Sequence, residues 1–157
     1  MESKLIDYIV THKEKHYRIA YSYVKNKEDA LDIVQDTIVK ALKYKHTLHE
    51  PSYLNTWFIK ILINNCKTYL QKQNRYIDVE DEILENLDSP HMDTYRSFEL
   101  EEALDKLSYT EKTIILLRYF EQLELKEVAK VMDKNLSTVK STLYRALKKL
   151  KVQLEED

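Results

Sequence analysis

The segment from residue 137 to residue 151, STVKSTLYRALKKLK, contains five basic side chains and no acidic one, although the whole chain has a net charge of −2. Lysine and arginine gathered on one helix can neutralise nucleic-acid phosphates, and arginine can also bond guanine in the major groove. For a charge run taken alone, a solvated surface face is the more ordinary explanation. The neighbouring elements must therefore decide between the two. The five residues are Lys140, Arg145, Lys148, Lys149 and Lys151.

Two shorter patterns could also support binding. Asp32, Gln35 and Asp36 have i, i+3 and i+4 spacing, so a helix would place them on one face, although such polarity is common on any exposed helix. From residue 59 to residue 76 there is no acidic side chain, and basic and amide side chains recur there. Cations combined with aromatic rings suit single-stranded nucleic acid, because rings stack on bases while cations neutralise phosphates. This basic face consists of Lys60, Asn64, Lys67, Lys72 and Arg75.

The sequence offers little support for catalysis or for a metal site. It contains no glycine, so the loops that cradle phosphates or present a strained nucleophile are missing. The pairs His12–His16 and His46–His49 could each share a metal, but no third or fourth ligand accompanies them. Carboxylates are dense between residues 78 and 85, yet a linker does not hold the fixed geometry that acid–base catalysis needs. We expect no enzyme, no metal, no cofactor and no small-molecule substrate, and we expect Cys66 to pack inside a helix.

Apolar residues at helical spacing predict an all-α protein of about seven helices. A long first helix over about residues 5–24 is expected to break between His12 and His16. Two more helices are expected over about residues 26–44 and 51–73, and Asn26 is the predicted N-cap of the first of these.

The C-terminal part of the chain has the pattern of a helix-turn-helix. Ser108 and Glu111 form an S-x-x-E capping box ahead of an apolar run. Two short apolar faces follow, separated by a turn from Asp133 to Leu136, and Ser137 is the predicted N-cap of the last helix. Because the second helix of such a motif binds DNA, this context favours DNA binding over a solvated face for the basic run. The two faces are Leu125, Val128, Ala129 and Met132, and then Val139, Leu143, Leu147 and Leu150.

The charge distribution divides the chain into three parts. Residues 1–75 contain 13 basic and 8 acidic side chains, residues 76–102 contain 1 and 10, and residues 103–157 contain 11 and 9. The acidic middle part has few apolar residues and contains Pro90, as expected of a linker. We therefore predict two small helical domains joined by an acidic linker. The predicted boundaries are residues 1–75, 76–97 and 98–157.

Stretches in both basic parts match motifs of one family. EVA at 127–129 and TVKSTLYRA at 138–146 are similar to "E-[IV]-A" and "T-V-K-S-x-L-x-R-A" of sigma region four. In the first part, DALDIVQDTIVKAL and YLNTWFIKILINN are similar to the polymerase-docking helix and the "W-L-x-x-I-x-x-N" motif of sigma region two. In this order the motifs resemble the extracytoplasmic-function (ECF) sigma factors of bacterial RNA polymerase. The details YSYVKN, DALDIVQ and RYFEQL resemble its sigma-V-like cell-envelope-stress group in Gram-positive bacteria.

The resemblance implies a role for each pattern. Asp32, Gln35 and Asp36 would dock on the clamp of the polymerase β′ subunit. The basic face and the loop before it would melt and bind the −10 element, and the last helix would contact the −35 element. The sequence does not choose between His49 and Asn55 for an unpaired base, and Trp57 by itself is better explained as a core residue. The implied −10 residues are His49, Asn55, Trp57, Lys60, Asn64, Lys67 and Arg75, and the implied −35 residues are Ser137, Thr138, Lys140, Ser141, Tyr144, Arg145 and Lys148, with Lys149 and Lys151 merely solvated.

The resemblance also implies partners. These are core RNA polymerase (the β′ clamp and the β flap), promoter DNA and an anti-sigma factor, commonly membrane-anchored, that masks the chain until a stress signal. We expect a cytoplasmic location, because the N-terminus has no apolar signal region and the longest aliphatic run, Ile114–Leu117, is far too short to cross a membrane. Two other classes stay open. A homodimeric helix-turn-helix regulator of an operator would need a dimerisation or effector domain, and a protein adaptor would not need a basic recognition helix.

Overall fold

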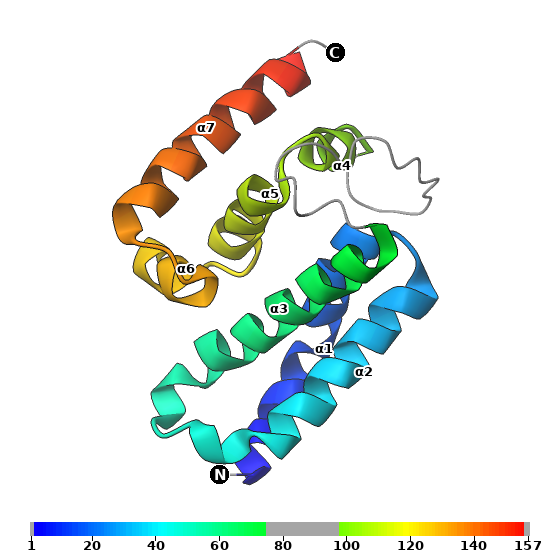
Figure 1. The fold of residues 1–157 in the computed structure, drawn as a ribbon, viewed down its shortest axis with the longest axis vertical. Helices are drawn as coiled ribbons and strands as arrows, with labels where there is room; N and C mark the ends of the chain where they lie inside the picture. The colour runs from blue at the N-terminus through cyan, green and yellow to red at the C-terminus, as the bar shows by residue number, and fades with distance from the viewer. Residues whose placement is uncertain (1, 75–97, 156–157) are drawn as a thin grey trace. The chain divides into compact units, whose positions relative to one another are not determined.

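The computed structural model describes residues 2–74 and 98–155, and within these two stretches the chain folds into seven α-helices and no strands (Figure 1). The predicted all-α fold is therefore confirmed. The predicted linker over residues 76–97 lies outside the described residues. The helices are α1 (Glu2–Val24), α2 (Lys27–Lys43), α3 (Leu54–Asn74), α4 (Phe98–Asp105), α5 (Tyr109–Ile115), α6 (Leu125–Met132) and α7 (Leu136–Glu155).

The chain divides into two compact units, Met1–Leu70 and Gln71–Asp157. In the first unit, α1, α2 and α3 each supply apolar side chains to one core. This core contains Leu5 and Tyr8 from α1, Ala41 from α2 and Phe58 from α3. Burying one large apolar side chain stabilises a fold by about 1.5–3 kcal/mol, so this shared core holds the three helices together.

Helix α1 is continuous, so the predicted break between His12 and His16 is wrong. His16 is 1% exposed and faces the core, while Lys13, Glu14 and Lys15 between the two histidines are exposed. The polar cluster in the sequence is therefore the outer face of an amphipathic helix, and no proline or glycine interrupts it.

The predictions for the starts of α2 and α3 are confirmed in part. The side chain of Asn26 accepts a hydrogen bond from the backbone N–H of Asp29 at 2.9 Å, which confirms the predicted N-cap of α2. A 3₁₀ turn at Lys45–Thr47 and another at Pro51–Tyr53 connect α2 to α3. The predicted start of the third helix at Pro51 thus belongs to a 3₁₀ turn that leads directly into α3.

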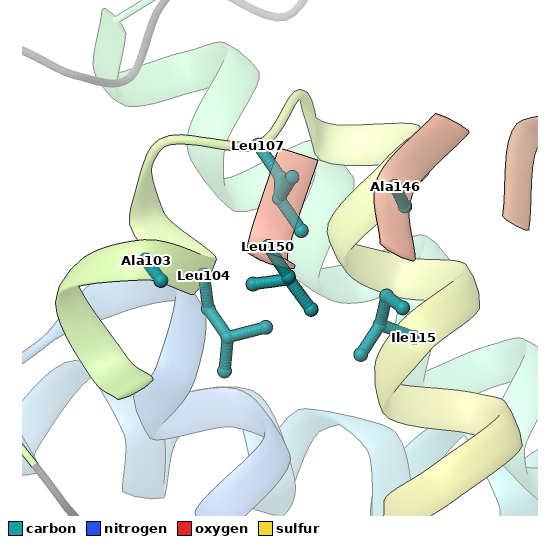
Figure 2. Packing of buried hydrophobic residues seen from close by; sticks show 6 residues of the cluster. All are labelled: Ala103, Leu104, Leu107, Ile115, Ala146 and Leu150. Atoms are coloured by element: carbon teal, nitrogen blue, oxygen red, sulfur yellow. The ribbon is translucent and has the colours of Figure 1, made fainter. Parts of the chain in front are cut away.

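In the second unit, α4, α5 and α7 surround an apolar cluster, in which Leu104, Ile115 and Leu150 point toward one another (Figure 2). The predicted capping box at the start of α5 is confirmed, because Ser108 and Glu111 exchange both of its hydrogen bonds. A π-helical turn at Leu116–Phe120 extends α5.

The turn between α6 and α7 is tight although the chain has no glycine. Asp133 closes α6 with a left-handed backbone, at φ 56° and ψ 45°, and the N–H of Lys134 donates to the carbonyl of Ala129 at 3.0 Å. Aspartate is among the residues that tolerate this conformation best after glycine. The predicted helix-turn-helix therefore forms with Asp133 at the position where glycine is common.

Candidate nucleic-acid interface

Helix α7 begins one residue before the predicted cap. The side-chain oxygen of Asn135 accepts from the backbone N–H of Thr138 at 2.9 Å and from the hydroxyl of Ser137 at 3.0 Å. Asn135 therefore holds the N-cap position, and Ser137 lies in the first turn of the helix. The prediction that Ser137 is the N-cap is wrong, because asparagine two residues earlier offers an equally good acceptor.

One face of α7 is buried and the opposite face is polar. Val139, Thr142, Ala146 and Leu150 are buried, at steps of three or four residues. Tyr144 is 74% exposed, and the guanidinium of Arg145 donates to the Thr142 hydroxyl at 3.3 Å. The structure brings all seven predicted −35 residues onto the exposed side of one helix. They are Ser137, Thr138, Lys140, Ser141, Tyr144, Arg145 and Lys148.

Lys149 is not merely solvated, and that prediction is wrong. Its Nζ donates to both carboxylate oxygens of Glu111, at 3.0 and 2.9 Å, and this carboxylate also accepts from the backbone N–H of Ser108. The side chain of Glu111 is 6% exposed. Lys149 therefore ties α7 to the start of α5, which fixes the helix that carries the exposed basic face.

Asp32, Gln35 and Asp36 are all exposed on α2. Asp36 is not isolated, because the Nζ of Lys40 lies 3.5 Å from its carboxylate. The same Nζ donates at 2.7 Å to the side-chain oxygen of Asn65, on α3. Lys40 was not among the residues predicted from the sequence, although its i, i+4 spacing from Asp36 is a detectable signal.

Asn65 joins this acidic face to the interior of the first unit. It is buried, and its amide nitrogen donates at 2.8 Å to the hydroxyl of Thr37, which in turn donates to the carbonyl of Ile33 at 2.7 Å. A chain of polar contacts thus runs from Asp36 through Lys40 to the middle of α3, next to Asn64.

The described part of the predicted basic face lies along α3, which also carries the exposed Lys72. Asn64 and Lys67 are exposed and Lys60 is half-buried, and these three residues share one side of the helix by their i, i+4 and i+7 spacing. Arg75 lies outside the described residues. Part of the predicted −10 surface is therefore a polar row on a helix that also supplies Phe58 to the core.

The segment before α3 is tied to that helix by Trp57. The indole N–H of Trp57 donates to the hydroxyl of Thr47 at 3.2 Å, and this hydroxyl donates to the carbonyl of Tyr44 at 2.8 Å. The ring of Trp57 is half-buried and packs against the core of the first unit, as expected of a core residue. His49, between the two 3₁₀ turns, is exposed.

Asn55, in the first turn of α3, is half-buried and already has a partner. Its side-chain oxygen accepts a hydrogen bond from the hydroxyl of Tyr8 on α1. The same hydroxyl lies 3.2 Å from Nε2 of His16. Burial, together with the nearby His12 and Lys15, lowers the pKa of His16 to about 4, so this ring is neutral near pH 7.

Within residues 2–74 and 98–155, neither histidine pair forms part of a larger ligand set. Among the described residues, no group of three or more histidine, cysteine, aspartate or glutamate side chains is arranged to hold a metal ion. The ring of His12 instead bonds the carbonyl of Tyr8 at 3.0 Å, and His16 stacks on Phe58. Cys66 is fully buried on α3, as predicted.

Known proteins match the chain over both units. Residues 8–76 match the family model for Sigma-70 region 2, and residues 97–150 match the model for Sigma-70, region 4. RNA polymerase sigma factor SigV of Bacillus subtilis (strain 168) is 46% identical over 153 residues, which cover 98% of this chain and 92% of SigV. The chain belongs to the sigma factors of RNA polymerase.

Other matches agree with an ECF sigma factor. The ECF RNA polymerase sigma-E factor of Haemophilus influenzae is 29% identical over 136 residues, covering 77% of this sigma factor and 72% of that one. The sigma factor RpoE, solved with the anti-sigma factor NepR from Bartonella quintana, has the same fold, with a TM-score of 0.79 at 22% identity and 98% of both chains covered. These findings confirm the predicted function and favour it over the homodimeric regulator. No helix in the described stretches is long and apolar enough to cross a membrane.

Proposed function

We propose that this ECF sigma factor contacts promoter DNA with two surfaces, and that each of the predicted domains contributes one. Residues 98–157 would bind the −35 duplex through the exposed face of α7. Residues 1–75 would bind core RNA polymerase and the melted −10 strand, and residues 76–97 would link the two.

The observation that carries this proposal is the arrangement of side chains around α7. Seven polar or basic side chains share its exposed face, while Val139 and Ala146 on the other face are fully buried. A major groove accepts one α-helix, and a bidentate arginine–guanine contact discriminates between bases by about 1–3 kcal/mol. Arg145 is the residue of this face that can make such a contact, whereas Lys148 is suited to phosphate.

The proposed polymerase contact is the acidic face of Asp32, Gln35 and Asp36, directed at the β′ clamp. These side chains are exposed on a helix whose other face is buried, so they can meet a partner without unfolding the unit. A cationic surface on the polymerase would compete with Lys40 for Asp36. The second domain would contact the β flap.

The proposed −10 surface combines α3 with the segment that precedes it. The cations on α3 would neutralise phosphates of the single strand, and polar side chains near its first turn would meet an unpaired base. This surface comprises His49, Asn55, Trp57, Lys60, Asn64, Lys67 and Arg75.

The remaining proposals concern partners and location. The sigma factor catalyses nothing alone, because nucleotidyl transfer belongs to the polymerase, and it acts in the cytoplasm, where the polymerase works. The solved relative RpoE was captured with an anti-sigma factor, which supports such a partner for this chain. We place that partner at the membrane, where it would hold the sigma factor until an envelope signal arrives.

Reconstitution with core polymerase tests the proposal. Arg145→Ala should lower −35-dependent transcription about ten- to hundredfold, as a lost bidentate base contact predicts. Lys148→Ala should weaken strong and weak promoters more evenly, because phosphates carry no base identity. Asp32→Lys with Asp36→Lys should abolish capture of core polymerase, while the control Asp7→Lys with Glu14→Lys, exposed acids of α1, should not. Normal capture by the first pair, or an Arg145→Ala effect equal at all −35 sequences, would contradict these assignments.

A further inference from the structure

A hydrogen-bonded pair of side chains connects α1 to the first turn of α3. Tyr8 donates its hydroxyl proton to the side-chain oxygen of Asn55, 47 residues away in the chain. The ring of Tyr8 is buried and meets Phe58 edge-on at 5.3 Å, while His16 stacks on the same Phe58 at 4.9 Å. The ring that carries this hydroxyl is therefore held by packing against Phe58.

The proton positions in this cluster follow from a simple count. A tyrosine hydroxyl has one proton, and here Asn55 receives it. The 3.2 Å contact between this hydroxyl and Nε2 of His16 must then be donated by the histidine ring, which can hold its single proton on that nitrogen when neutral. His16 therefore donates to Tyr8, and Tyr8 donates to Asn55.

The hydrogen bond from Tyr8 determines how the Asn55 amide can meet a ligand. An asparagine amide normally presents an acceptor and two donors, and it bonds adenine by using one of each. Tyr8 takes up one of the two lone pairs of this oxygen and fixes the orientation of the planar amide, so the NH₂ group is held in a set direction from which it can donate to another partner. Asn55 directly follows the segment that contains His49 and lies on the helix of Lys60 and Asn64.

We propose that Tyr8 is a positioning residue that holds Asn55 as a hydrogen-bond donor toward an acceptor atom of one unpaired −10 base. The proposal rests on the assignment of the −10 surface to α3 and goes beyond it, because it selects Asn55 over His49 and names the chemistry of the contact. The partner atom is a ring nitrogen or a carbonyl oxygen of the base.

Selection from a randomised promoter pool tests this directly. Holoenzyme made from core polymerase and each sigma variant retains fragments with random bases across the −10 element, and sequencing gives the base preference at each position. Asn55→Ala should flatten the preference at one position by about tenfold, the loss expected when a base contact disappears. Tyr8→Phe keeps the buried ring and should lower the preference at the same position several-fold. The double variant should match Asn55→Ala alone, because both changes act through one contact.

Two further variants separate positioning from stability. Tyr17→Phe removes a hydroxyl from the same helix, where the half-buried ring of Tyr17 lies 6.0 Å from that of Tyr21, and should leave every preference unchanged. Asn55→Asp keeps the acceptor for Tyr8 but has no NH₂ group, so it should flatten the same position as Asn55→Ala does.

Different results would contradict the role of Tyr8, the role of Asn55 or the proposed function. If Asn55→Ala flattens a position and Tyr8→Phe does not, or if Asn55→Asp retains the preference, positioning by Tyr8 is overturned while the −10 surface stands. If Asn55→Ala changes no position although wild-type holoenzyme selects a −10 sequence, Asn55 has no role and the inference fails with it. If wild-type holoenzyme selects no −10 sequence at all, the proposed function fails first.

Discussion

Lys149→Met is the substitution that best tests how α7 is held in place. The buried carboxylate of Glu111 accepts two hydrogen bonds from Lys149, at 2.9 and 3.0 Å, and the variant keeps the aliphatic stem while it removes the cation. Breaking a buried ion pair costs about 3–5 kcal/mol, because one charge stays buried without a partner. The Lys149 side chain is 54% exposed, so water offsets part of this cost, and we expect the free energy of unfolding to fall by about 1–3 kcal/mol.

Urea unfolding followed by circular dichroism measures this loss. Lys151→Met is the matched control, because Lys151 is exposed and lies two residues after Lys149 on α7. It should change stability by less than about 0.5 kcal/mol. Adding Glu111→Gln to Lys149→Met should recover part of the loss, since no unpaired carboxylate then remains buried at this site. If Lys149→Met and Lys151→Met unfold at the same urea concentration, the ion pair contributes nothing to the fold and the reasoning is wrong.

The start of α7 and the buried ring of His16 give two more predictions. Asn135→Ala should lower the free energy of unfolding by about 1 kcal/mol, as loss of an N-cap does, whereas Ser137→Ala should cost less than about 0.5 kcal/mol in the same urea titration; equal losses would contradict the cap. The pKa of His16 is lowered from its ordinary 6.5 to about 4, so the unfolded chain binds more protons between these values. Stability should therefore fall as the pH drops from 6.5 to 4, by about 3 kcal/mol, and an equal slope in His16→Gln would refute this cause.

Local features of this fold could be predicted because neighbouring residues alone determine them. Asn26 caps α2 through a residue three positions away, and Ser108 and Glu111 form their capping box over the same distance. The exposed face of α7 follows from the helical period, which puts Tyr144 on the opposite side from the buried Ala146. The two caps join residues within one helical turn of each other, and the exposed face depends only on the spacing along one helix.

Contacts between distant residues could not be predicted in this way. Lys149 meets Glu111 across 38 positions and Tyr8 meets Asn55 across 47, and no local spacing connects either pair. The expected break in α1 was wrong for a related reason. The polarity near His16 favoured a loop, but tertiary packing buries this ring against Phe58 and keeps the helix intact.

The proposed contact with the −35 element requires a helix that is held firmly in the second unit but can differ at the residues that face the bases. The two faces of α7 divide these requirements. The inner row, from Val139 to Leu150, holds the helix in the second unit, so substitutions there should lower stability and base recognition together. The outer row, which includes Lys140 and Arg145, is exposed, and the hydrogen bond from Arg145 to Thr142 stays within α7, so base recognition can change there while the fold is kept. Lys149 lies beside the outer row in sequence but acts with the inner one, because its cation is committed to Glu111. A lysine or arginine on such a helix therefore indicates DNA contact only when its charge is not already paired with a buried carboxylate of the same unit.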